Sequence, residues 1–209
     1  MLLLHLRVLE FLKSIDQKLL LFLNGQHNTF FDFVMYWASD RFIWIPFYLL
    51  LLFFVVKKFG KKAYLVLVLV AAMIAVSDQV SSGLVKNMVQ RLRPCHDPEI
   101  QDRVHLVEGV CGGSFGFYSS HASNTWALAL FLILIFKHRM RAGATRTNES
   151  RDGLIPLYAA LVVYASLVSY SRIYLGTHYP FDVLTGVATG TILSFIFARV
   201  FSRFGGLKN

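Results

Sequence analysis

Acidic side chains are scarce in this sequence. It contains 12 Asp and Glu residues against 21 Lys and Arg residues, so its formal net charge is +9. In a soluble protein such an excess of positive charge would suggest a nucleic-acid partner. Here the basic residues gather in short segments between long apolar ones. Membrane topology therefore explains the charge better, and no nucleic-acid partner is expected.

Patterns that bind metal ions are also missing. The segments that carry polar and charged side chains show no cluster of carboxylates suited to Mg²⁺ and no Cys/His spacing suited to Zn²⁺. We therefore expect a site without a metal or a cofactor. The chain has no internal repeat and no low-complexity tract, so residues 1–209 are expected to form a single domain.

Apolar residues make up 56% of the chain, and they are concentrated in long runs. About 20 largely apolar residues cross a bilayer as a helix, and backbone groups in lipid must be hydrogen-bonded internally. The sequence thus predicts an all-α polytopic membrane helix bundle with five clear transmembrane helices. Their expected positions are residues 42–57, 63–84, 122–138, 154–170 and 183–201.

The first forty residues differ from these five segments. Residues 2–24 are apolar but carry five charges, namely Arg7, Glu10, Lys13, Asp16 and Lys18. Each charge at the centre of a spanning helix would cost about 2.5–3.5 kcal/mol. We therefore expect an amphipathic helix in the membrane interface, followed by a second interfacial helix over residues 28–40. A sixth, imperfect span is the alternative. A cleavable signal peptide is not expected, because the initial apolar run is brief and no small-residue cleavage site follows it.

Basic residues between the spans indicate the topology. They occur at three places, which lie on one side of the membrane if the five spans alternate: Lys57, Lys58, Lys61 and Lys62; Lys137, Arg139, Arg141, Arg146 and Arg151; and Arg199, Arg203 and Lys208. The positive-inside rule makes that side cytoplasmic, together with the C-terminus. Residues 85–121 and 171–182 are then expected on the extracytoplasmic face.

Both cysteines of the chain, Cys95 and Cys111, fall in the expected outer loop. An extracytoplasmic location permits a disulfide there, which would contribute roughly 3 kcal/mol by closing that loop. Two free thiols are the alternative, because spacing does not determine pairing.

The expected outer side also collects cations and hydroxyl groups. Lys86, Arg93 and Arg172 supply three positive charges, and guanidinium groups fit the oxygens of a phosphate. Ser119 and Ser120 stand at the start of an expected helix, where hydroxyls and backbone N–H groups bind anions. These residues predict a site for a tetrahedral oxyanion.

Two histidines and a carboxylate accompany the expected anion site. One imidazole can attack phosphorus while a second protonates the leaving oxygen, and His178 and His121 are the candidates. Asp182 follows His178 by four residues, a spacing that lets a carboxylate hold the ring at the start of a helix, where Pro180 suits the first turn. Asp78 lies inside the second expected span, and we expect it either to support a basic site residue or to make a purely structural hydrogen bond.

Taken in order, these residues resemble the three-part signature of the type 2 phosphatidic acid phosphatase (PAP2) superfamily, in its membrane lipid phosphatase branch. The signature segments are Lys86-x6-Arg93-Pro94, Ser119-Ser120-His121, and Ser171-Arg172-x5-His178-x3-Asp182, all within residues 85–182. The middle segment departs from the family, whose usual Pro-Ser-Gly-His reads Tyr118-Ser119-Ser120-His121 here. Losing the glycine adds a side chain beside the phosphate but removes no catalytic group.

The resemblance implies a role for each matched residue. His178 would be the nucleophile that forms a phosphohistidine, Asp182 its orienting partner, and His121 the general acid. The expected phosphate-binding residues are Lys86, Arg93, Ser119, Ser120 and Arg172. The resemblance also implies hydrolysis without a metal and a lipid substrate that reaches the site sideways from the membrane.

Several functions are compatible with these residues. The favoured one is hydrolysis of a lipid phosphate monoester or pyrophosphate, with undecaprenyl pyrophosphate or phosphatidylglycerol phosphate preferred, at the outer face of a bacterial inner membrane. Lipid A and phosphatidic acid are alternative substrates. A haloperoxidase is disfavoured because relatives with that activity are larger and soluble. A transporter or anion-binding protein without catalysis is the non-enzyme alternative, although its charges would be expected along a path through the bilayer. The oligomeric state stays open.

Overall fold

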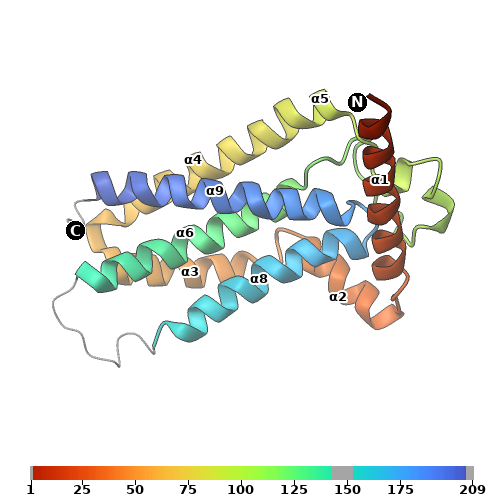
Figure 1. The fold of residues 1–209 in the computed structure, drawn as a ribbon. Helices are drawn as coiled ribbons and strands as arrows, with labels where there is room; N and C mark the ends of the chain where they lie inside the picture. The colour runs from red at the N-terminus through yellow and green to blue at the C-terminus, as the bar shows by residue number, and fades with distance from the viewer. Residues whose placement is uncertain (1, 143–152, 206–209) are drawn as a thin grey trace.

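A computed structural model describes residues 2–142 and 153–205 of the chain. All of its regular structure is helical, as the apolar runs predict (Figure 1). Five helical segments lie side by side along a common direction: α3 (Ile45–Phe59), α4 (Ala63–Asp78), α6 (Ser120–Ala142), α8 (Ile155–Tyr174) and α9 (Pro180–Phe204). Their positions agree with the five expected spans to within a few residues.

Among the described residues, three stretches are long and apolar enough to cross a membrane, fewer than the five that we expected. They are Ile45–Val89, Ile155–Tyr174 and Pro180–Phe204. The first holds 45 residues and comprises α3, the 3₁₀ turn η1 (Gly60–Lys62), α4 and the helical residues that continue from α4 to Val89. Gly60 adopts φ +54°, and the chain folds back there into a helical hairpin (Figure 1). α6 is not among the three, because polar residues near both of its ends dilute its apolar middle. The protein is nonetheless an integral membrane protein.

The N-terminal forty residues form the two helices that the sequence predicts. These are α1 (Leu2–Asn24) and α2 (Thr29–Ser39), and α1 lies across one end of the bundle (Figure 1). α1 is not one of the stretches suited to spanning. One detail differs from a simple interfacial helix, because Asp16 is fully buried. Its carboxylate faces the protein rather than water.

α4 does not stop at Asp78 but continues into the segment that carries Lys86. A π-helical segment, η2 (Gln79–Val85), joins it to the short helix α5 (Lys86–Val89). π-helical turns are rare and frequently occur at functional sites. Gln90 then ends the helix in the left-handed region, at φ +50°. Lys86 thus stands where the second expected span gives way to the outer loop.

The expected cytoplasmic and outer sides lie at opposite ends of the bundle. The α3–α4 turn and the C-terminal ends of α6 and α9 lie together, and α1 and the loop that follows α5 lie at the other end (Figure 1). Lys62 donates to the carbonyl of Gly205, which ties the hairpin to the end of α9. Three of the basic residues used to predict topology lie outside the described residues: Arg146, Arg151 and Lys208.

Candidate active site

Close contact between α6 and α9 brings two of the signature segments together. A Cβ atom added at Gly186 would lie 2.4 Å from the carbonyl oxygen of Ser119, and one at Gly190 would lie 2.3 Å from that of Ser123. Small residues four apart allow two membrane helices to approach this closely. The start of α6 is therefore fixed against the start of α9, where Asp182 lies.

The segment between α8 and α9 positions His178. The backbone N–H of His178 donates to the carbonyl of Arg172 at 3.1 Å, and the hydroxyl of Thr177 donates to the same carbonyl at 2.9 Å. Tyr179 caps α9, and its N–H donates to Oδ2 of Asp182 at 3.1 Å. Pro180 occupies the first turn of that helix, as expected. The side chain of His178 is consequently almost fully buried, with 1% of its surface exposed.

Asp182 lies beside the ring of His178, as the spacing of four residues predicts. Its Oδ2 atom is 3.7 Å from Nδ1 of His178, close enough for electrostatic attraction but longer than a hydrogen bond. On the other side of the ring, Nη1 of Arg93 lies 3.3 Å from Nε2. A guanidinium can only donate, so Nε2 accepts and the ring proton belongs on Nδ1, facing Asp182. This tautomer leaves the lone pair of Nε2 on the side of the cations.

Burial and positive charge keep His178 neutral. Desolvation lowers the pKa of His178 well below 6.5, and the charges of Arg93, Arg172 and Lys86 lower it further. An unprotonated imidazole is the nucleophilic form. The same three cations would attract a phosphate group to the ring.

Several buried donors in this region have no acceptor. Nε of Arg93, Nε of Arg172 and Nδ1 of His178 are each buried without a hydrogen-bond partner in the structure. Arg172 is only 8% exposed, and its Nη1 donates to the hydroxyl of Ser39 on α2. Nδ1 of His178 faces Asp182, but the two unpaired guanidinium nitrogens are costly to bury and indicate a site prepared for an oxyanion.

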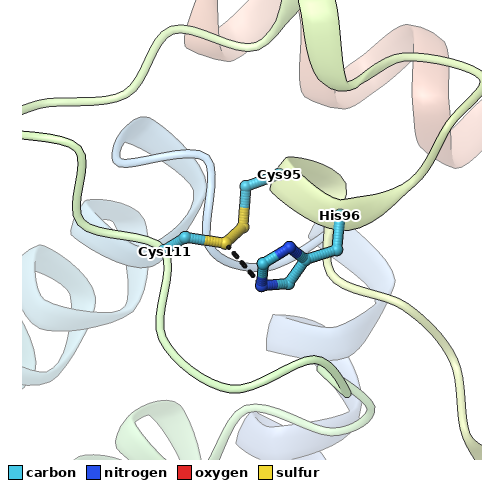
Figure 2. Close-up of side chains that lie close together, drawn as sticks. All are labelled: Cys95, His96 and Cys111. Atoms are coloured by element: carbon cyan, nitrogen blue, oxygen red, sulfur yellow. Dashed lines mark hydrogen bonds between the residues drawn. A yellow bond between two sulfur atoms is a disulfide. The ribbon is translucent and has the colours of Figure 1, made fainter.

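The outer loop closes over Arg93. The backbone N–H of Arg93 donates to the carbonyl of Ser114 at 2.9 Å, and a Cβ atom on Gly116 would lie 3.1 Å from Cγ of Arg93 and 3.2 Å from Oδ2 of Asp182. Cys95 and Cys111 are joined through their sulfur atoms, with the Cα atoms 6.0 Å apart (Figure 2). This disulfide closes the loop next to Arg93.

The second histidine of the signature has a different environment. His121 is exposed to a cavity of about 510 Å³ between α3, α4, α6 and α8. Ser120, Asn124 and Asp78 line the same end, while the rest of the wall is mainly apolar, with Trp44 and Leu51 among its residues. The cavity therefore joins a polar end at His121 to an apolar body at the depth of the spans.

The remaining signature residues lie at the edges of this region. Ser119 is fully buried, and its hydroxyl accepts from the N–H of Ala122 at 3.4 Å. Lys86 is half-buried, and its ammonium donates to the hydroxyl of Ser82 at 3.4 Å. Within the described part of the chain, Asp78 forms no ion pair with a site cation; it accepts from the side-chain amide of Asn124 at 2.9 Å. Whether Asp78 acts through Lys86 stays a hypothesis.

Three contributors to this site are not among the predicted residues. Arg91 falls within the variable positions between Lys86 and Arg93, yet its guanidinium bonds to Oδ1 of Asp182 at 2.8 Å. Gly186 and Gly190 were not predicted to contribute either, although their four-residue spacing on an apolar helix is a recognisable packing motif.

Comparison with known proteins agrees with the geometry. Residues 61–205 match the model of the PAP2 superfamily. A lipid A 4′-phosphatase of Bacteroides thetaiotaomicron is 38% identical over 91% of this chain and 78% of its own length, and one of Porphyromonas gingivalis is 32% identical over 92% and 75%. The crystal structure of a transmembrane PAP2-type phosphatidylglycerolphosphate phosphatase from Bacillus subtilis superposes with a TM-score of 0.66 at 19% identity, covering 92% of this chain and 87% of that one. The last match shows the fold alone. The chain therefore belongs to the PAP2 superfamily, as a membrane lipid phosphate phosphatase.

Proposed function

We propose that this protein removes the 4′-phosphate of lipid A through a phosphohistidine at His178. Two relatives that match nearly the whole chain carry the name lipid A 4′-phosphatase, and they support this alternative over undecaprenyl pyrophosphate or phosphatidylglycerol phosphate. The observation that carries the chemistry is the buried ring of His178 between Arg93 and Asp182. The other candidate lipid substrates are compared with lipid A in the test below.

The first step of the proposed reaction is attack by Nε2 of His178 on phosphorus. Its lone pair forms the N–P bond while the bond from phosphorus to the sugar oxygen breaks. Asp182 faces the Nδ1 proton, and its negative charge stabilises the positive charge that develops on the ring. The side chains of Arg93, Arg172 and Lys86 offset the charge on the phosphate oxygens, as does the start of α6 at Ser119 and Ser120.

His121, protonated when the substrate binds, provides the proton for the departing alcohol. The leaving oxygen stays attached to the lipid, so the acid must lie on the side that the lipid occupies, and His121 is exposed to the cavity. In the second step a water molecule gives its proton to His121 and attacks phosphorus, which releases inorganic phosphate and restores His178. Both steps are balanced without a metal ion or a cofactor.

The apolar body of the cavity suits an acyl chain.

Five spans would place the site at the extracytoplasmic face. The hairpin of α3 and α4 supplies two of these spans, and α6, α8 and α9 supply the others. Basic residues at the α3–α4 turn and the ends of α6 and α9 would then face the cytoplasm. In a bacterium this corresponds to the inner membrane with the outer loop in the periplasm.

The test uses purified protein in nanodiscs with four substrates: lipid A, phosphatidylglycerol phosphate, undecaprenyl pyrophosphate and phosphatidic acid. We expect phosphate release to be fastest from lipid A, and mass spectrometry of the product to place the loss at the 4′ position. His178→Ala should abolish release, and His27→Ala, which removes an exposed histidine, should leave it unchanged. Faster release from another lipid would refute the substrate, and activity in His178→Ala would refute the nucleophile.

A further inference from the structure

The two oxygens of Asp182 have separate partners. Oδ2 faces Nδ1 of His178 and accepts from the N–H of Tyr179. Oδ1 accepts from Nη1 of Arg91 at 2.8 Å. Asp182 is fully buried. Among the described residues, Arg91 is the Lys or Arg residue that forms an ion pair with it. A buried carboxylate stays ionised only when it is paired in this way.

Arg91 is itself held by a helix that contributes nothing to the family signature. Its Nη2 donates to Oδ2 of Asp16 on α1 at 2.7 Å, and its guanidinium lies 4.0 Å from the ring centroid of Tyr179. Asp16 is fully buried, and its Oδ1 accepts from the N–H of Phe181 at 2.9 Å. One guanidinium thus joins a carboxylate of α1 to the carboxylate of α9.

We propose that Arg91 and Asp16 are positioning residues for the reaction. Asp16 orients Arg91, and Arg91 keeps Asp182 ionised with Oδ2 turned toward His178. This inference rests on the proposed role of His178 as nucleophile. It also makes α1, which crosses the end of the bundle, part of the catalytic apparatus rather than only an interfacial anchor (Figure 1).

The geometry distinguishes this chain of contacts from simple docking of α1. A second ion pair also joins α1 to the outer loop, since Nζ of Lys13 lies 2.6 Å from Oε1 of Glu99. Both of its side chains are exposed, and neither contacts Asp182. Lys13→Gln therefore removes a bridge between the same two segments without touching the path to His178, which makes it a matched control.

The experiment measures kcat, KM and the pH dependence of kcat for the wild type, Arg91→Gln, Arg91→Lys, Asp16→Asn and Lys13→Gln. Around metal sites, loss of the partner that orients a ligating side chain typically reduces activity by about 10–100-fold, and we expect the same range for the ion pair that orients Asp182. We expect Arg91→Gln to lower kcat by that factor while KM changes less than about threefold, because phosphate contacts are intact. Arg91→Lys should recover part of the loss, Asp16→Asn should show a smaller loss, and Lys13→Gln should match the wild type.

The pH profile of kcat distinguishes a positioning role of Arg91 from a role in folding alone. Without the charge of Arg91, Asp182 should take up a proton at higher pH, so the acidic limb of the kcat profile should move to higher pH in Arg91→Gln. Activity is expressed per folded protein, measured by size-exclusion chromatography and thermal melting. The inference is overturned if Arg91→Gln keeps kcat within twofold, if its acidic limb does not move, or if Lys13→Gln loses as much activity.

The same assay separates this inference from the proposed function. If the wild type is active and His178→Ala is inactive while Arg91→Gln is unaffected, the proposed function stands and the positioning role fails. If His178→Ala is as active as the wild type, the nucleophile is wrong, and the positioning role fails with it because no reaction at His178 remains to be supported.

Discussion

A single methyl group added at Gly190 should push α6 and α9 apart at the active site. The Cβ atom of Gly190→Ala would lie 2.3 Å from the carbonyl oxygen of Ser123 and 2.9 Å from the backbone nitrogen of Ala127. Ordinary contacts at this position begin near 3.4 Å. Both obstacles belong to the backbone of α6, so a side-chain rotation cannot relieve them. α6 and α9 must therefore move apart by about 1 Å.

This displacement acts directly on the chemistry. α6 begins with Ser120 and His121, and α9 carries Asp182 in its first turn. A misplacement of about 1 Å can reduce the rate by roughly 10²-fold, and overpacking of this kind costs about 1–3 kcal/mol of stability. We expect Gly190→Ala to stay folded but to lose kcat by that order. Gly186→Ala, which lies closer to Ser119, should lose at least as much.

The assay compares kcat and melting temperature in nanodiscs. Ala188→Val is the matched control, because it adds more bulk to an exposed position of the same helix, between the two glycines. It should behave as the wild type. Wild-type kcat in Gly190→Ala, or an equal loss in Ala188→Val, would show that helix contact does not set the geometry of the site.

Three further predictions follow from other contacts. Because burial lowers the pKa of His178 below 6.5, the unfolded chain binds a proton there that the folded chain does not, so stability should fall as pH decreases through 6.5. Between pH 7.5 and 5.5 this group should account for a loss on the order of 1 kcal/mol, measured as the difference between the pH dependence of the wild type and of His178→Gln; equal slopes would contradict it. Replacing Cys95 and Cys111 with serine should lower the free energy of unfolding by about 3 kcal/mol, and an unchanged denaturation midpoint would count against a stabilising bond. Vanadate should inhibit as a mimic of the transition state, and Arg172→Gln should weaken that inhibition roughly tenfold or more; equal inhibition would remove Arg172 from the phosphate site.

The helices of this protein were predictable because lipid imposes a simple rule. Apolar runs of sufficient length must form helices, and the expected ranges for α1 and α2 agree with the structure to within a residue. The number of spans was harder to predict. A hairpin whose turn is only three residues long gives one continuous 45-residue stretch, and α6 has too many polar residues near its ends.

The site was predictable only where a fixed spacing encodes the chemistry. His178 and Asp182 are four residues apart at a helix start, and local geometry alone brings them together. Arg91 and Asp16 are 75 residues apart, and nothing local links them. Asp16 is one of five charges in an amphipathic helix, and the sequence does not show which of these the fold buries. Packing of α1 against the start of α9 decides that, and it depends on tertiary structure.

The unequal surroundings of the two histidines favour a particular direction for the substrate. His178 lies under the outer loop with 1% of its surface exposed, among cations that would hold the phosphate. His121 lies at the polar end of the apolar cavity. A phosphate bound between them would point its bridging oxygen toward the cavity and its other oxygens toward Arg93 and Arg172. Since the alcohol remains attached to acyl chains, this orientation lets the lipid stay in the membrane while only the phosphate enters the protein. The reverse assignment would require the lipid to pass through the closed loop beside the disulfide. The position of His121 beside the cavity thus fits the roles that the family signature implies, with His178 as nucleophile and His121 as acid.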